Sequence, residues 1–147
     1  MCLAVALLSA SCDRKTIYDN YKHTPVNGWE KNDTLTFAID SVEQEGEYVE
    51  EIGVRINGLY PFMSLSLVVQ QTVLPMGKTY DTTLNCKLID ENGRVKGSGI
   101  SCYQYSFPLK VVPLSVGDTL RVAVRHNMKR EILPGVSDIG LKLTRRE

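Results

Sequence analysis

The sequence predicts an all-β fold, an antiparallel β-sandwich that is jelly-roll-like and has about eight strands. Apolar and polar residues alternate in many short segments, which is the pattern of half-buried strands. Glycine, proline, asparagine and aspartate separate these segments, and no segment has convincing helical spacing. The segments are too irregular for an even up-and-down barrel, which favours a jelly-roll-like sandwich.

Three alternating segments make up the first half of the predicted domain. They begin near residues 33, 48 and 59, and each places its apolar side chains on one face, which we expect to lie in the core. These side chains are Leu35, Phe37 and Ile39, then Ile52, Val54 and Ile56, and then Leu65, Leu67 and Val69. Asn57-Gly58 predicts a turn before the third segment, because both residues tolerate positive φ.

The second half supplies five further segments, at residues 80–89, 95–107, 109–112, 118–127 and 139–143. Asn92-Gly93 predicts a hairpin between the first two. In that hairpin Cys102 would lie opposite Thr83, so that Cys86 would point to the other face. We therefore expect two free, mostly buried thiols. A bulge at Gly97 or Gly99 would shift the register and allow a disulfide instead.

An apolar run at the start of the chain ends in small residues and a cysteine, Ser9-Ala10-Ser11-Cys12. This pattern is typical of a bacterial lipoprotein signal, in which the cysteine is acylated and becomes the new N-terminus. We therefore expect a signal peptide at 1–11, a lipid on Cys12, a polar tether over 12–28 and one sandwich domain over 29–147. The missing basic region before the apolar run predicts that the natural start lies upstream.

The charges are balanced, with 17 Lys and Arg against 17 Asp and Glu. Bulk charge therefore gives no attraction to nucleic acid or to an anionic membrane, and we expect no nucleic-acid partner. A lipid on Cys12 would hold the protein at a membrane without help from charge. The prediction is a lipid-anchored protein of the cell envelope, attached to the outer membrane, with its membrane face left open.

The sequence predicts a protein that is not an enzyme and has no cofactor or metal. It lacks the Gly-x-Ser-x-Gly, His-Glu-x-x-His and phosphate-loop motifs. His23 and His126 have no second histidine at ligand spacing, so we expect a surface role or ordinary hydrogen bonds for both. Asp90 begins a segment that resembles a calcium loop, but Ser101 stands where the loop needs its carboxylate. A glycan hydrolase remains an alternative, because such an enzyme needs two carboxylates that lie close together in space and not at any fixed sequence spacing.

Two kinds of binding surface are open at this point. Aromatic and arginine side chains dominate protein interfaces, so Arg55 and Tyr60 are candidates for a contact with another protein, whereas we expect Trp29 in the core. Tyr103 and Tyr105 lie two apart on one predicted strand and share a face. They predict either a platform on which sugars stack or a packed aromatic pair.

Several residue groups stand in a characteristic order along the chain, each of them once. They are Trp29 and Phe37; Arg55-Ile56-Asn57, Tyr60-Pro61-Phe62 and Leu65; Asp81-Thr82 and Leu84; Gly93, Gly97 and Gly99; His126-Asn127-Met128-Lys129-Arg130; and Leu133 with Gly135-Val136 and Asp138-Ile139-Gly140-Leu141. In these groups and in Cys12 the chain resembles the gliding-motility lipoprotein family GldH. The resemblance implies a lipid-anchored protein of the gliding apparatus and of the secretion machinery linked to it. It implies no enzymatic activity and carries over no catalytic residue.

Overall fold

The computed structural model describes residues 15–95, 97, 99 and 102–146. Within these ranges the chain forms ten strands and no helix. The strands are β1 (Thr16–His23), β2 (Trp29–Glu30), β3 (Leu35–Ile39), β4 (Gly46–Asn57), β5 (Ser64–Leu74), β6 (Lys78–Lys87), β7 (Cys102–Leu114), β8 (Thr119–His126), β9 (Ile132–Leu133) and β10 (Val136–Arg145). None of these residues belongs to a helix that is long and apolar enough to cross a membrane.

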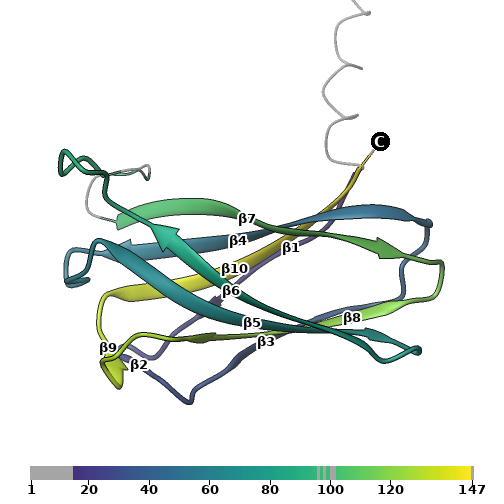
Figure 1. The fold of residues 1–147 in the computed structure, drawn as a ribbon, viewed down its shortest axis with the longest axis horizontal. Helices are drawn as coiled ribbons and strands as arrows, with labels where there is room; N and C mark the ends of the chain where they lie inside the picture. The colour runs from purple at the N-terminus through teal and green to yellow at the C-terminus, as the bar shows by residue number, and fades with distance from the viewer. Residues whose placement is uncertain (1–14, 96, 98, 100–101, 147) are drawn as a thin grey trace, which may run out of the picture.

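The strands form two four-stranded antiparallel sheets that stack face to face, with the orders β1-β10-β4-β7 and β3-β8-β5-β6 (Figure 1). Of the eight long strands, only β5 and β6 follow each other within one sheet; every other step crosses between the sheets. This is the strand order of a jelly roll, with β2 and β9 as a short extra ribbon. The predicted all-β, jelly-roll-like sandwich is confirmed.

The core lies between the sheets and consists of the alternating side chains that the pattern predicts. Its largest members are Trp29, Tyr48, Phe37, Ile52, Leu65, Leu67, Leu88, Leu114, Leu120, Leu133, Ile139 and Leu141. Trp29 is completely buried, as expected, and its indole N–H donates to the Asp33 carbonyl at 2.7 Å. His126 is also buried; its Nε2 lies 2.9 Å from the Trp29 carbonyl, and its Nδ1 accepts the Met128 N–H at 3.3 Å. His126 therefore has an ordinary structural role.

The expected tether over 12–28 is wrong for Thr16–His23, which forms β1 and pairs with β10 along most of its length. The strand has no apolar alternation because its aromatic residues face both ways. Tyr18 packs edge-to-face on Phe37 inside the sandwich, whereas Tyr21 lies on the outside. The sandwich therefore includes residues from Thr16 onward. The predicted signal peptide and Cys12 lie outside the residues described.

The predicted pairing of β6 with the strand that follows it is also wrong, because β6 pairs with β5 and β7 pairs with β4. The chain does turn at Asn92-Gly93, where the Asp90 N–H donates to the Arg94 carbonyl at 2.8 Å, and among the described residues one bridge, Ile89 to Val95, joins the two sides of the turn. Both thiols are free, as predicted, but Cys102 is exposed, whereas burial raises the pKa of the Cys86 thiol to about 12. The pieces at 95–107 and 109–112 are replaced by one strand, β7. Pro108 and Pro113 are tolerated in it because β7 is an edge strand.

Candidate functional site

The outer face of the β1-β10-β4-β7 sheet carries an aromatic ring laid flat on glycines. Tyr21 pairs with Gly140, and Gly140 pairs with Gly53 on the next strand. A Cβ atom placed on Gly53 would come within 2.7 Å of the Tyr21 Cζ, and one on Gly140 within 2.8 Å of the Tyr21 Cδ1. These distances are too short for any side chain as long as the Tyr21 ring keeps this position. The two glycines are therefore what allows the ring to lie across two strands.

Arg55 covers the other side of this ring. Its guanidinium lies 3.7 Å from the centre of the Tyr21 ring, and its Nε donates to the Gln104 Oε1 at 3.0 Å. Burial raises the pKa of Tyr21, and the charge of Arg55 partly opposes that rise. The two terminal amino groups of Arg55 make no hydrogen bond to a described residue. The guanidinium is thus held in one orientation, and its two terminal amino groups remain able to donate hydrogen bonds. A side chain that is already ordered loses less conformational entropy when it binds a ligand.

The neighbouring position of β10 adds a carboxylate. Asp138 is paired with Arg55 across the strands and with His23 of β1 on its other side. The His23 Nδ1 contacts the Asp138 Oδ1, and Asp138 is almost completely buried while His23 is exposed. We call Tyr21, His23, Arg55, Gln104 and Asp138 the Arg55 face. Beside it lies a hollow of about 170 Å³ that Ser106 also lines.

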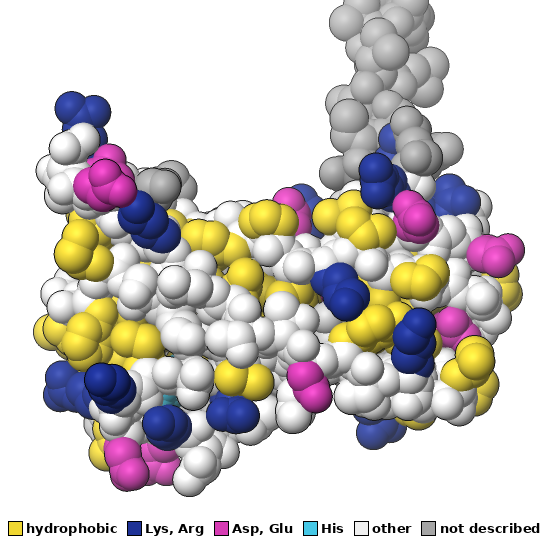
Figure 2. All heavy atoms as spheres, viewed as in Figure 1, with side chains coloured by type: hydrophobic (Ala, Val, Ile, Leu, Met, Phe, Trp, Pro, Cys, Tyr) yellow, Lys and Arg dark blue, Asp and Glu magenta, His cyan; other side chains and the backbone are white. Residues whose placement is uncertain are grey.

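The Arg55 face provides hydrogen-bond donors and acceptors that are suited to contact with a ligand. Within the described ranges, no group of three His, Cys, Asp or Glu side chains could hold a metal ion. Positive and negative side chains are intermixed over the side of the molecule in Figure 2, as the balanced charge predicts. This side of the molecule therefore presents no large electrostatic field of one sign.

The other predicted binding residues do not join Arg55. Tyr60 lies in the loop after β4, where its hydroxyl donates to the Ser64 carbonyl at 2.6 Å, and burial raises its pKa. Tyr103 and Tyr105 are on β7 but face the interior: Tyr105 is 5% exposed and donates to the Leu88 carbonyl at 3.2 Å, and Tyr103 is half-buried. No exposed tyrosine platform results.

The sequence predicts Arg55 as a contact residue but does not predict the side chains that surround it. Tyr21 lies in the predicted tether, and the alternation of apolar and polar residues marks neither Gln104 nor Asp138. These residues meet only through the register of four strands, which is not visible in the sequence. Gly53 and Gly140 were the available signal, since glycine inside a strand often marks a close approach.

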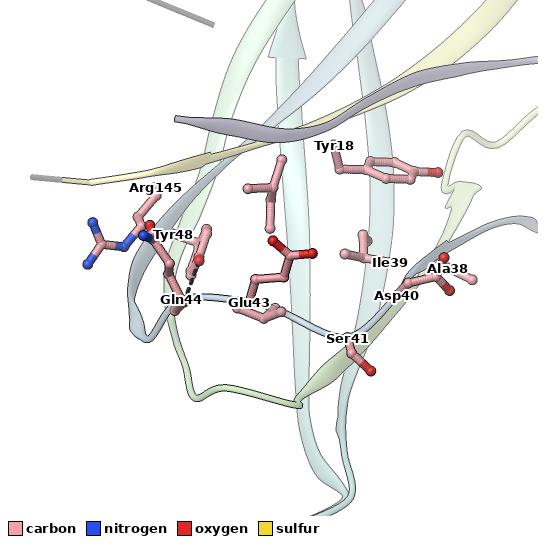
Figure 3. Close-up of a pocket in the computed structure, with 11 residues that line it drawn as sticks. Tyr18, Ala38, Ile39, Asp40, Ser41, Glu43, Gln44, Tyr48 and Arg145 are labelled. Atoms are coloured by element: carbon pink, nitrogen blue, oxygen red, sulfur yellow. Dashed lines mark hydrogen bonds between the residues drawn. The ribbon is translucent and has the colours of Figure 1, made fainter. Parts of the chain in front are cut away.

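A groove between the edge strands β1 and β3, which belong to different sheets, is the second candidate surface (Figure 3). It has a volume of about 680 Å³ and lies between β1, β3 and the loop that joins β3 to β4. Its floor is apolar, because Ile39, Val42 and Tyr48 line it and are buried. We call this hollow the β1/β3 groove. Its remaining lining residues are Ile17, Tyr18, Ala38, Asp40, Ser41, Glu43, Gln44 and Arg145.

A buried polar pair lies inside the sandwich. Glu50 of β4 and Gln71 of β5 are both completely buried, and their side-chain oxygen and nitrogen atoms have no hydrogen-bond partner among the described residues. Burial raises the pKa of the Glu50 carboxyl to about 7, although the Gln71 amide and the Lys110 charge oppose the rise. Near neutral pH this carboxyl therefore changes between its neutral and charged forms.

Together these features define a jelly-roll β-sandwich with two candidate binding surfaces. The chain belongs to the GldH lipoprotein family, whose model matches residues 16–143. It is 25% identical to the gliding motility lipoprotein GldH of Flavobacterium johnsoniae, over 99% of this chain and 94% of that protein. It is also 25% identical to a gliding motility lipoprotein GldH homolog of Christiangramia forsetii, over 93% of this chain and 88% of that protein.

Among solved structures, a family GH115 4-O-methyl-alpha-glucuronidase superposes on the chain with a TM-score of 0.48 and 13% identity. The match covers 92% of this chain and 18% of the glucuronidase. A family 35 carbohydrate-binding module from Clostridium thermocellum superposes with a TM-score of 0.40 and 12% identity, over 86% of this chain and 89% of the module.

Proposed function

We propose that this protein is a non-catalytic, lipid-anchored component of a gliding-motility apparatus, and of the secretion machinery linked to it, in the cell envelope. It is attached to the outer membrane by a lipid on Cys12 and acts by binding other proteins of the assembly. Membership of the GldH lipoprotein family supports the assignment. The names of the two relatives from Flavobacterium and Christiangramia support a role in gliding.

The Arg55 face is the observation that carries the binding role. A guanidinium stacked on a ring and fixed by Gln104 is costly to build, since it requires glycines in the middle of two strands. Its two terminal amino groups are nevertheless left for a ligand. Arginine and tyrosine held in this way are typical of the residues that dominate protein interfaces.

The alternative role, a carbohydrate-binding module, depended on Tyr103 and Tyr105 as an exposed platform. Both rings face the interior of the sandwich, and Tyr105 stacks on Phe107 at 5.9 Å between ring centres. The platform reading therefore loses its support. Binding of a glycan elsewhere on the molecule stays an outcome of the experiment below.

Affinity capture from detergent-solubilised envelopes tests the proposal. Tagged wild type would be compared with Cys12→Ala, Arg55→Ala and a matched variant, Arg121→Ala, whose arginine lies on the outer face of the other sheet. We expect wild type and Arg121→Ala to retain the same set of envelope proteins. Cys12→Ala should lose that set because it is not held at the membrane, and Arg55→Ala should lose at least part of it.

Two results would contradict the proposal. One is that wild type retains no envelope protein, while the purified protein is retained on a glycan array. The other is that Arg55→Ala and Arg121→Ala capture the same proteins in the same amounts as wild type, which would remove the Arg55 face from the function.

A further inference from the structure

The β1/β3 groove is formed by fixed walls. Val42 exchanges backbone hydrogen bonds with the turn after β7, donating to the Asp118 carbonyl and accepting from the Gly117 N–H, both at 2.8 Å. The Tyr48 hydroxyl donates to the Gln44 carbonyl at 2.6 Å. These bonds hold the loop between β3 and β4 at several points. The groove is therefore preformed, as most binding sites are.

Two carboxylates are left projecting between these fixed points. Figure 3 shows the Glu43 side chain turned up into the groove, with Asp40 beyond it toward Ala38. Neither carboxylate has a hydrogen bond or ion pair with a described residue. The neighbouring cation that lines the groove, Arg145, is engaged elsewhere: its Nε and Nη2 donate to the Glu45 carbonyl at 3.1 and 2.9 Å, and in Figure 3 it points away.

The other walls suit an aliphatic stem. Ile17 is 42% exposed, and the half-buried Tyr18 ring lies at the side of the groove opposite Arg145 in Figure 3. The floor below them is apolar. A lysine or arginine side chain combines the two features required, because its methylene groups pack on apolar atoms while its charge reaches a carboxylate. Its cation could also lie against the Tyr18 ring.

The backbone around the groove offers a place for the rest of such a ligand. β1 and β3 are edge strands, each paired with one neighbour only. β1 carries a register shift between Thr16 and Tyr18, which interrupts a regular edge, whereas the pairing of β3 is regular from Leu35 to Ile39. An extended peptide can therefore add to the free edge of β3.

We propose that the β1/β3 groove binds an extended, basic segment of a partner protein, which adds to the edge of β3 and inserts a lysine or arginine side chain beside Glu43. This inference deepens the proposed function and rests on it, because the proposed function places the partner protein in the cell envelope. Ile17 follows Cys12 by five positions, so at most about 18 Å of chain separates a lipid there from the groove. The bound segment then lies close to the membrane surface.

A direct binding measurement tests the groove. The probe is a blocked nine-residue peptide of alternating threonine and valine with one central arginine, added to the purified full chain in neutral detergent. Matched peptides carry central lysine, glutamine or glutamate. We expect the arginine and lysine peptides to bind, the glutamine peptide to bind at least ten times more weakly, and the glutamate peptide not to bind.

Variants place the effect in the groove. Glu43→Gln should weaken the arginine peptide at least tenfold without unfolding the protein, because the side chain is exposed and makes no bond in the fold. The matched control is Glu51→Gln, which removes an acid from the outer face of the β1-β10-β4-β7 sheet, away from the groove. It should leave binding of the arginine peptide unchanged. Equal binding of all four peptides, or equal binding by wild type and Glu43→Gln, would overturn the proposal.

A lipid occupant is distinguished in the same experiment. Phosphatidylglycerol added to the detergent micelles should not displace the arginine peptide, since the carboxylates of Glu43 and Asp40 repel an anionic headgroup. Displacement by this lipid would make the groove a lipid site and overturn the peptide proposal. Failure of the peptides while envelope capture by wild type persists would remove this proposal and leave the proposed function standing.

Discussion

The outer faces of the two sheets differ, although both sheets bury the same kind of core. On the β1-β10-β4-β7 sheet, the Arg55 face joins side chains of four strands through a ring stack, a hydrogen bond and the contact between His23 and Asp138. The outer face of the β3-β8-β5-β6 sheet carries Thr36, Ala38, Gln70, Arg121 and Ala123. These side chains make no hydrogen bond or ring contact with one another.

We call the outer face of the β3-β8-β5-β6 sheet the plain face. It shows that a sheet of this sandwich can form without hydrogen bonds or ring contacts that join its outer side chains. The Arg55 face therefore demands another explanation, since glycines in the middle of strands cost roughly 0.5–1 kcal/mol each relative to alanine. The ordering of a long arginine adds a further entropic cost. We interpret this cost as the consequence of holding Arg55 ready for a partner.

The largest effect is expected from adding a side chain at Gly53, beneath the Tyr21 ring. Gly53→Val would push its side chain into the Tyr21 ring and displace both the ring and Arg55. We expect a loss of about 2–3 kcal/mol in the free energy of unfolding, measured in urea. The control on the plain face, Ala123→Val, should change it by no more than about 0.5 kcal/mol. Equal losses would show that the two faces do not differ.

The next largest effect is expected from pH. It should not depend on either outer face, because the titrating group, Glu50, is buried in the core. The Glu50 carboxyl has its pKa raised from 4.5 to about 7 by burial, so the folded state binds this proton more tightly than the unfolded state. The stability it contributes is complete below pH 4.5 and is lost as the pH rises through 7, up to about 3 kcal/mol. Urea unfolding between pH 4 and 8 measures the change.

The variant Glu50→Gln keeps the side-chain shape without a titrating group and should flatten this profile. Arg55→Ala and Arg121→Ala should both retain the profile of wild type, because neither touches the core. A flattened profile in Arg55→Ala would mean that its effects on capture arise from the interior rather than from the surface.

A smaller effect is expected from removing each arginine. Arg55→Ala loses the stack on Tyr21 and the bond to Gln104, and should cost about 1 kcal/mol in the free energy of unfolding. Arg121→Ala should cost no more than about 0.5 kcal/mol. Calorimetry on the two purified variants gives both values, and a reversed order would contradict the difference between the faces.

The smallest effect is expected from Tyr21→Phe. The ring remains on Gly53 and Gly140 and still supports Arg55, so the free energy of unfolding should change by less than about 0.5 kcal/mol. Envelope capture should also be unchanged. Loss of capture in this variant would show that the hydroxyl, and not the ring, is what a partner recognises.

The sequence predicted the sandwich well, because alternation reports burial directly. It failed at β1, where Tyr18 faces the core and Tyr21 faces outward, so that no apolar period exists. It divided β7 at Pro108, since a proline interrupts an interior strand but not an edge strand. Here the position of the strand in the sheet mattered, and a linear pattern cannot give that position.

The candidate site was predictable only in part. Arg55 was found by residue type, whereas its companions depend on cross-strand register: Asp138 and Gln104 are its neighbours on the two adjacent strands. Tyr103 and Tyr105 share a face, as alternation predicted. That this face is the interior follows from the second sheet, which alternation on one strand does not reveal.

Crosslinking in intact cells tests the central claim most directly. A photoreactive phenylalanine analogue at Ser106 would lie beside the Arg55 face, and the same analogue at Thr83 would lie on the outer face of the other sheet. Both side chains are exposed on edge strands. The account predicts a defined crosslinked envelope protein from Ser106 that is absent with Arg55→Ala, and none from Thr83. Crosslinks from Thr83 alone, or equal crosslinks from both positions, would contradict it.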